Sequence, residues 1–287
     1  MKIKPWLFFA LCTTIFWGIW GALSELPAKE GFPATLGYVV WAITMIIPAV
    51  VALRIIHWKP ERHKRAILYG LLIGFFGAAG QLILFEALKR GPAYLVFPFV
   101  SLSPLVTIFL SLFLLKEKAS VRSWVGIIIA LVAIPLLSYQ PAGSDYQHGS
   151  LWIFLSLIVF LFWGIQAYFM RVANNQMKAE SIFFYMTLVS LALIPAAVFY
   201  TDFREGMNWS GKWPLITAGI QILNAVGALF LVYAFRHGKA IIVSPLTNTG
   251  APVITIILSL LIYGVFPHVV IATGMILAIV AIFLMAE

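Results

Sequence analysis

Long apolar stretches recur along the whole chain, and they constrain its fold more than any other feature. Each stretch has about 20 residues, which is the length that an α-helix needs to cross a hydrocarbon core of about 30 Å. The stretches are continuous rather than alternating, so membrane-spanning strands are excluded. Because 62% of the 287 residues are apolar and 10% are charged, a soluble domain could not bury the apolar surface. The sequence therefore predicts an all-α polytopic membrane protein.

We predict ten transmembrane helices. The first of them could be mistaken for a cleaved signal peptide. We reject this because the sequence FWGIW at 16–20 recurs as FWGIQ at 162–166, and a segment that belongs to a repeat is expected to stay in the fold. The predicted spans are 6–24, 35–54, 66–88, 93–115, 122–138, 150–171, 180–201, 214–235, 240–262 and 267–286.

Basic residues are unevenly distributed between the two sides of this arrangement. With the amino terminus inside the cell, 14 of the 19 Lys and Arg residues fall on the cytoplasmic side and five on the outer side. Basic residues favour the cytoplasmic side of a membrane. We therefore predict a multi-pass protein of the plasma (inner) membrane with both termini in the cytoplasm. The net charge of +9 has the same origin, so we expect no nucleic-acid partner.

The second half of the chain repeats features of the first half at a spacing of 146 to 148 residues. Gly91 and Pro98 recur as Gly238 and Pro245, and Gly126 recurs as Gly274. We predict two five-helix repeats, 1–140 and 141–287, within one membrane domain. Because five is odd, the second repeat enters the membrane in the opposite orientation, which gives a 5+5 inverted-topology repeat around a central cavity. The alternative is that duplication is only an easy way to build a bundle.

Proline pairs mark equivalent places in the fourth and ninth predicted spans. A proline leaves the carbonyl four residues earlier without its helical donor, so we expect the carbonyls of Tyr94, Val100, Ile241 and Asn248 to be free. Interrupted, polar helices at matching places of two repeats indicate a binding site. Ser101 and Ser103 lie between Pro98 and Pro104, and Thr247 and Asn248 lie between Pro245 and Pro252; these four polar residues are candidate substrate contacts that we expect to meet near the midplane. Simple kinks, with the polar groups bonded to their own helix, are the alternative.

Two tryptophans occupy equivalent positions in the middle of spans one and six. Trp17 and Trp163 either line the cavity or pack between helices, because a buried indole N–H needs a partner in both cases. Gln166 occupies the position in the second repeat that Trp20 occupies in the first. This difference suits a substrate with one apolar and one polar end. We add Gln81 and Asn224 as further substrate-binding candidates.

The carboxylate of Glu86 lies within the third predicted span. An intramembrane carboxylate suggests proton coupling, with its repeat mate Tyr233 as a second candidate. The alternative is an interfacial ion pair between Glu86 and Arg90 at i, i+4. The sequence contains no metal-ligand cluster, phosphate-binding loop or nucleophile–base motif, so we predict no catalytic residue, no metal, no cofactor and no enzymatic activity.

The segment ALKRGPAYLVFPFVSLSPLVTIFLSLFLLKEK at 87–118, followed by Gly126, resembles a recurring pattern of the drug/metabolite transporter superfamily, in particular its EamA-like transporters. Glu117 is similar to the Glu that ends the proline-bearing span in that family. The resemblance implies ten spans, a 5+5 inverted repeat and a central cavity, and many members export amino acids or other small metabolites. The chain departs from the pattern at 264–265, where Gly and Val replace the second Glu, and at Glu86, where Tyr is expected.

We therefore predict a secondary transporter that moves a small neutral or zwitterionic metabolite across the plasma membrane by alternating access. The first choice of substrate is amino-acid-like, with export as the direction. The alternatives are a sugar- or nucleoside-type uptake transporter of the same fold and a non-transport, lipid-handling membrane scaffold. The expected partners are the small-molecule substrate, the lipid bilayer and protons as coupling ion, in a monomer or homodimer.

Overall fold

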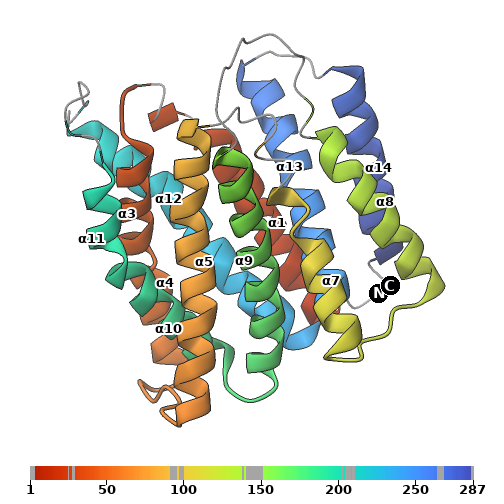
Figure 1. The fold of residues 1–287 in the computed structure, drawn as a ribbon, viewed down its shortest axis with the longest axis horizontal. Coiled ribbons are helices and arrows are strands. Elements are labelled where there is room, and N and C mark those ends of the chain that lie inside the picture. The colour runs from red at the N-terminus through yellow and green to blue at the C-terminus, as the bar shows by residue number, and fades with distance from the viewer. Residues whose placement is uncertain are drawn as a thin grey trace.

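The computed structural model describes residues 4–24, 26–27, 30–90, 96, 100–137, 139, 151–201, 203, 208, 211–263 and 268–285. Throughout these ranges the regular structure is helical and no strand occurs, as predicted (Figure 1). The helices are α1 (Pro5–Leu23), α3 (Ala34–Thr44), α4 (Ile46–Ile55), α5 (Lys64–Arg90), α7 (Pro104–Phe113), α8 (Val121–Leu137), α9 (Leu151–Asn174), α10 (Ala179–Ala192), α11 (Ile194–Phe199), α12 (Lys212–His237), α13 (Ala240–Tyr263) and α14 (Val269–Met285).

Seven stretches of the described chain are long and apolar enough to cross a membrane. Three shorter apolar helices, α7, α8 and α14, accompany them. The ten residues of α7 rise only about 15 Å, so the number of ten spans stays a prediction. Large apolar side chains remain exposed on the outside of the bundle, as the lipid environment of a polytopic membrane protein permits. The seven stretches are Pro5–Leu23, Ala34–Ile55, Lys64–Ala87, Leu151–Asn174, Ala179–Phe199, Lys212–His237 and Ala240–Leu258.

Two of these stretches are broken at equivalent places. Met45 separates α3 from α4, and Leu193, which lies 148 residues later, separates α10 from α11. Each break precedes a proline by two or three residues, Pro48 in the first case and Pro195 in the second. Because proline has no N–H to donate to the preceding turn, it weakens the helix there. The breaks show that the local structure, and not only the sequence, recurs between the halves.

The helices form two groups with α1 and α9 between them (Figure 1). The large group contains α3, α4, α5, α10, α11 and α12, and the small group contains α7, α8, α13 and α14. α1 packs against α12 of the large group and α13 of the small group, while α9 packs against α5 and α7. Both central helices therefore contact both groups. The division into two sequence repeats, 1–140 and 141–287, stays a prediction.

α1 begins and α14 ends at the same edge of the bundle, the lower edge in Figure 1, which we call the terminal edge. The connections α4–α5, α7–α8, α9–α10 and α12–α13 also lie at this edge (Figure 1). Most basic residues of the described chain are in these connections or at the helix ends beside them. They are Lys4, Arg54, Lys59, Arg62, Lys64, Arg65, Lys116, Lys118, Arg122, Arg171, Lys178, Arg236 and Lys239.

Glycines on α5 allow close approach of two neighbouring helices. A Cβ on Gly70 would lie 2.5 Å from the Cβ of Tyr185 on α10, and a Cβ on Gly74 would lie 2.8 Å from the Cβ of Val189. Gly77 faces the side-chain amide of Gln166 on α9. Small residues are used in membranes for such close contacts. The glycine face thus seats α5 between α10 and α9.

Candidate functional site

Two equivalent hydrogen bonds attach the small group to the central helices. The hydroxyl of Thr107 on α7 donates to the carbonyl of Gly164 on α9 at 3.1 Å. The hydroxyl of Thr255 on α13 donates to the carbonyl of Gly18 on α1 at 3.0 Å. The two threonines are 148 residues apart and the two glycines 146 residues apart. Each half of the chain therefore supplies a helix that binds the first helix of the other half in the same way.

The two equivalent tryptophans pack against equivalent glycines. A Cβ on Gly227 of α12 would lie 2.7 Å from Nε1 of Trp17, and a Cβ on Gly80 of α5 would lie 2.6 Å from Nε1 of Trp163. The indole N–H of Trp17 donates to the carbonyl of Asn224 at 3.3 Å. Both rings are half-buried at the interfaces α1–α12 and α9–α5. In this structure they pack between helices, and their contact with a substrate stays a prediction.

Trp20 on α1 and its repeat mate Gln166 on α9 have different partners at the two interfaces. The indole N–H of Trp20 donates to Oε1 of Gln221 at 3.1 Å, and the side chain of Asn224 is buried close by on α12. Gln166 instead faces Gly77. Polar side chains at the α1–α12 interface thus correspond to glycines at the α9–α5 interface. Gln81 lies half-buried on α5, next to Gly80.

The proline pairs do not act alike in the two spans, which corrects the prediction. Pro104 is the first residue of α7, so the fourth span is interrupted before it. α13 runs without a break through Pro245 and Pro252. The carbonyl of Val100, predicted to be free, accepts the N–H of Ser103 at 3.0 Å. Tyr94 and Pro98 lie outside the described residues.

The predicted meeting of Ser101 and Ser103 with Thr247 and Asn248 stays a prediction. The hydroxyl of Thr247 donates to the carbonyl of Val243 at 3.0 Å, and the amide of Asn248 donates to the carbonyl of Ser244 at 2.9 Å, both on α13 itself. α13 and α7 are linked instead by Ser244, whose hydroxyl donates to that of Thr107 at 3.3 Å. Ser103 is buried and Ser101 half-buried at the start of α7. A role in substrate contact stays a prediction for each of these four residues.

Glu86 and Tyr233 lie at opposite ends of the bundle. Glu86 forms an ion pair with Arg90 at 2.6 Å, the alternative arrangement that the sequence allowed. The hydroxyl of Tyr233 donates to Oε1 of Glu180 at 2.7 Å, near the terminal edge. The two side chains thus have separate partners, and a shared proton-coupling role stays a prediction. Within the described residues no three His, Cys, Asp or Glu side chains form a group that could hold a metal ion.

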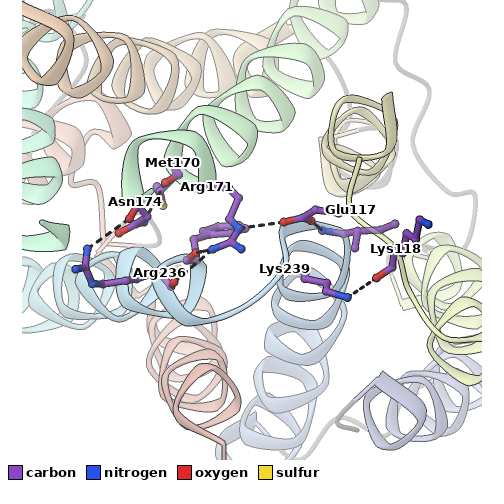
Figure 2. Close-up of polar contacts among 9 residues, drawn as sticks. Glu117, Lys118, Met170, Arg171, Asn174, Arg236 and Lys239 are labelled. Atoms are coloured by element: carbon purple, nitrogen blue, oxygen red, sulfur yellow. Dashed lines mark hydrogen bonds and ion pairs between the residues drawn. The ribbon is translucent and has the colours of Figure 1, made fainter. Parts of the chain in front are cut away.

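A polar network at the terminal edge was not predicted from the sequence (Figure 2). Nε of Arg171, in the last turn of α9, donates to Oε1 of Glu117 at 2.9 Å. The Glu117 side chain is 8% exposed and that of Arg171 is 20% exposed. At such burial, removal of one partner leaves an uncompensated charge and costs about 3–5 kcal/mol.

Both partners of this pair also bind helix ends. Oε2 of Glu117 accepts the N–H of Ile241 in the first turn of α13 at 3.1 Å. Nη1 of Arg171 donates to the carbonyl of Phe235 in the last turn of α12 at 2.9 Å (Figure 2). A negative group is favoured at a helix N-terminus and a positive group at a C-terminus. The pair therefore clamps both sides of the turn at Gly238, which connects the large group to the small group.

Further contacts at this edge support the pair. Nη1 of Arg236 donates to the carbonyl of Met177 at 3.0 Å, and Nδ2 of Asn174 donates to the carbonyl of Val232 at 3.0 Å. Nζ of Lys239 donates to the carbonyl of Lys118 (Figure 2). A depression of about 380 Å³ lies beside them. Its lining is Lys4, Trp6, Ala119, Ser120, Ser123, His237, Gly238, Lys239 and Ile242.

The model of the EamA-like transporter family matches the chain twice, at residues 4–139 and at residues 150–286. The chain belongs to the EamA-like transporter family. It is therefore a polytopic membrane protein of a transporter family within the drug/metabolite transporter superfamily, as the sequence resemblance predicted.

Three curated relatives of this EamA-like chain are informative. "Uncharacterized protein MJ1333.1" of Methanocaldococcus jannaschii is 25% identical over 132 residues, which are 46% of this chain and 95% of the relative. "Protein LicB" of Haemophilus influenzae is 24% identical over 212 residues, 64% of this chain and 69% of the relative. A "probable 4-amino-4-deoxy-L-arabinose-phosphoundecaprenol flippase subunit ArnE" of Hamiltonella defensa subsp. Acyrthosiphon pisum is 30% identical over 80 residues, 28% of this chain and 72% of the relative.

A solved crystal structure shares the fold of the EamA-like chain. Its TM-score is 0.81 at 16% sequence identity, and the match covers 99% of this chain and 96% of the other. At this identity the likeness shows the fold alone.

Some residues of this site can be recognised in the sequence, whereas the partners of others cannot. Thr107 and Thr255 lie 148 residues apart, at the spacing of the repeat, and Gly18 and Gly164 belong to the recurring FWG motif. Their equivalence was thus visible in the sequence, but the contacts between them were not. Glu117 was visible as a family feature, but nothing in the sequence indicated that Arg171 is its partner.

Proposed function

We propose that this EamA-like protein is a secondary transporter that moves a small neutral or zwitterionic metabolite across the plasma membrane by alternating access. The first choice of substrate is amino-acid-like, and the direction is export. The residues proposed to contact it are those around the central helices: Trp17, Trp20, Gln81, Ser101, Ser103, Trp163, Gln166, Asn224, Thr247 and Asn248.

The observation that carries this proposal is the pair of equivalent bonds, Thr107 to Gly164 and Thr255 to Gly18. Two halves that pack through equivalent contacts can exchange conformations, and an inverted repeat then opens a central site to each side in turn. The separate family matches of the two halves support the same interpretation. So does the M. jannaschii relative, which is matched over 95% of its length by less than half of this chain.

The distribution of basic residues supports the proposed orientation. Thirteen basic residues of the described chain lie at the terminal edge, in connections or at helix ends. Basic residues of short loops favour the cytoplasmic side. We therefore assign the terminal edge to the cytoplasm, with both ends of the chain on that side.

The polar groups around the central helices support a substrate of low net charge. Indole, amide and hydroxyl groups are present at Trp20, Gln166, Asn248 and Ser101. Arg171 is engaged by Glu117 at the terminal edge, away from this region. A phosphate-bearing substrate would require Arg or Lys in the site. An amino acid satisfies this chemistry and so does a sugar, so the sugar- or nucleoside-type transporter stays the second candidate.

Ligand-dependent thermal stabilisation of the purified protein tests the proposal. A ligand that binds only the folded state at 100 times its Kd stabilises it by about 2.7 kcal/mol. We expect amino acids, and not sugars or nucleosides, to raise the melting temperature. We expect Trp163→Phe, which removes the indole N–H, and Asn248→Ala to abolish this shift. Thr273→Val on α14 is the matched control, because that exposed hydroxyl bonds only its own helix.

The outcomes separate the alternatives. Stabilisation by sugars or nucleosides alone would overturn the amino-acid assignment and favour the second candidate. A full ligand shift in both Trp163→Phe and Asn248→Ala would remove these residues from the site. Transport of the stabilising ligand by reconstituted vesicles then distinguishes a transporter from a membrane scaffold.

A further inference from the structure

The ion pair Glu117–Arg171 connects helix groups that belong to different parts of the bundle. Glu117 follows α7 and binds the N-terminus of α13, both in the small group. Arg171 is on the central helix α9 and binds the end of α12, in the large group. Any motion that separates the two groups at the terminal edge must therefore break this pair or its backbone bonds.

Other acidic side chains at this edge do not span the two groups. Glu61, between α4 and α5, accepts hydrogen bonds from the backbone N–H of Lys178 and from the hydroxyl of Ser181 at the start of α10. Glu180 on α10 accepts the hydroxyl of Tyr233 on α12. These contacts stay within the large group and its connections. They hold that group together, whereas Glu117 holds it, through Arg171, to the small group.

At the positions that the repeat relates to Glu117 and Arg171, the sequence does not provide an equivalent pair. At the spacing of 148 residues that relates Gly126 to Gly274, the mate of Glu117 is Val265, and Gly264 precedes it. At the spacing of 146 residues that relates the two FWG motifs, the mate of Arg171 is Glu25. Valine and glutamate cannot form an ion pair. The two halves thus differ in residue type at the positions of this ion pair.

We propose that the Glu117–Arg171 pair is a gate that holds the bundle closed at the terminal edge, and that the lack of an ion-pairing couple at the repeat mates Val265 and Glu25 makes this closed form the resting state. The proposal rests on the alternating-access function proposed above. It adds that the terminal edge is the one held closed and that Glu117 and Arg171 form the gate. It also gives a reason why the form closed at this edge is more populated at rest than the form open there. Opening at the terminal edge requires Arg171 to leave Glu117 while the turn at Gly238 bends.

Cysteine accessibility tests the gate without any substrate. Ser111 is a suitable reporter because it is fully buried, its hydroxyl has no partner among the described residues, and its carbonyl accepts the N–H of Glu117 at 3.1 Å. Ser111→Cys is introduced into a Cys12→Ser background, and a membrane-impermeant maleimide is applied to everted and to right-side-out vesicles. The gate variants are Glu117→Gln and Arg171→Gln. Lys118→Gln is the matched control, because it removes an adjacent exposed charge and leaves the pair intact.

In everted vesicles we expect Glu117→Gln and Arg171→Gln each to raise the labelling rate of Ser111→Cys by about tenfold or more, because the closed state loses its buried pair. In right-side-out vesicles the rate stays at that of the parent, and Lys118→Gln leaves both rates unchanged. Unchanged labelling in both gate variants overturns the proposal. A rise of equal size from both faces also overturns it, because that pattern indicates general loosening of the fold.

Different experiments test the proposed gate and the proposed transport function. Labelling requires no ligand, so unchanged rates refute the gate even if the thermal panel identifies a substrate. Absence of ligand stabilisation and transport refutes the proposed function, whatever the labelling rates are. Either gate variant alone decides the result if the other does not accumulate in the membrane.

Discussion

Gly18 and Gly164 leave no space for a side chain where the central helices meet the small group. A Cβ on Gly164 would collide with the Cβ of Val106 and would lie 2.7 Å from the carbonyl oxygen of Ser103. Backbone and β-branched atoms cannot yield without moving α7. We therefore expect Gly164→Ala to destabilise the protein by about 1–3 kcal/mol, measured as a lower melting temperature of the purified protein in detergent.

Gly219 provides the control for this substitution. It lies within α12, and a Cβ added there meets no heavy atom within 4 Å. Alanine is favoured over glycine inside a helix by about 0.5–1 kcal/mol, so Gly219→Ala is expected to leave the melting temperature unchanged or to raise it. If the melting temperature of Gly164→Ala equals or exceeds that of the wild type, α7 does not pack as tightly against α9 as it does in the structure.

Single residues could be located in the repeat from the sequence, but their partners could not. Trp17 and Trp163 were recognised as equivalent because both follow phenylalanine and precede glycine. Their packing against Gly227 and Gly80 depends on which helices are neighbours. A helix that is apolar on all sides does not reveal its contact face through hydrophobic periodicity. The residue-level chemistry of the site therefore required the structure.

Helix α7 depends on Thr107 more than α13 depends on Thr255. The Thr107 hydroxyl is fully buried, donates to Gly164 and accepts the hydroxyl of Ser244. The Thr255 hydroxyl is only half-buried and shares its donor between the carbonyls of Gly18 and Ala251.

We accordingly expect Thr107→Val to cost about 1–2 kcal/mol and Thr255→Val about 0.5 kcal/mol, near the average for hydrogen bonds between membrane helices. Denaturation of the detergent-solubilised protein measures both changes. Thr273→Val serves again as the exposed control. Equal losses for the two threonines would contradict the unequal burial on which the prediction depends.

The fourth and ninth spans show that a proline pair in the sequence does not by itself decide whether a helix is interrupted. Both contain a proline pair, yet α7 begins at Pro104 while α13 continues through Pro245 and Pro252. A first-turn position suits proline because no helical acceptor awaits its missing N–H. Inside a membrane helix proline is tolerated when neighbouring groups satisfy the freed carbonyls. Which case applies depends on surrounding helices, so the sequence predicted two interruptions where the structure has one.

At the scale of the whole molecule, the predictable features are those that each segment carries by itself. Apolar stretches, the excess of basic residues at one edge and the twofold family pattern are local properties, and they led to an all-helical membrane transporter. The pairing of Glu117 with Arg171 joins residues 54 positions apart and requires the correct packing of α7, α9, α12 and α13. Such a contact has no local signal, which explains why the terminal-edge network was not predicted.

The orientation of the whole protein is open to a direct measurement with two exposed positions. Lys59 lies in the connection α4–α5 at the terminal edge, and Gly211 precedes α12 at the opposite edge, where a Cβ meets no heavy atom within 4 Å. In a Cys12→Ser background we expect an impermeant maleimide to label Gly211→Cys in intact cells. Lys59→Cys is expected to be labelled only after the membrane is permeabilised.

The physical reason is the attraction of basic residues to the anionic cytoplasmic leaflet, worth about 1 kcal/mol for each Lys or Arg near the surface. With so many basic residues at the terminal edge, the reversed orientation is expected to be negligibly populated. The Cys12→Ser parent without a new cysteine measures background labelling. Labelling of Lys59→Cys in intact cells would place the terminal edge outside. The Glu117–Arg171 gate would then close the outer side of the membrane, and the resting state would be open toward the cytoplasm.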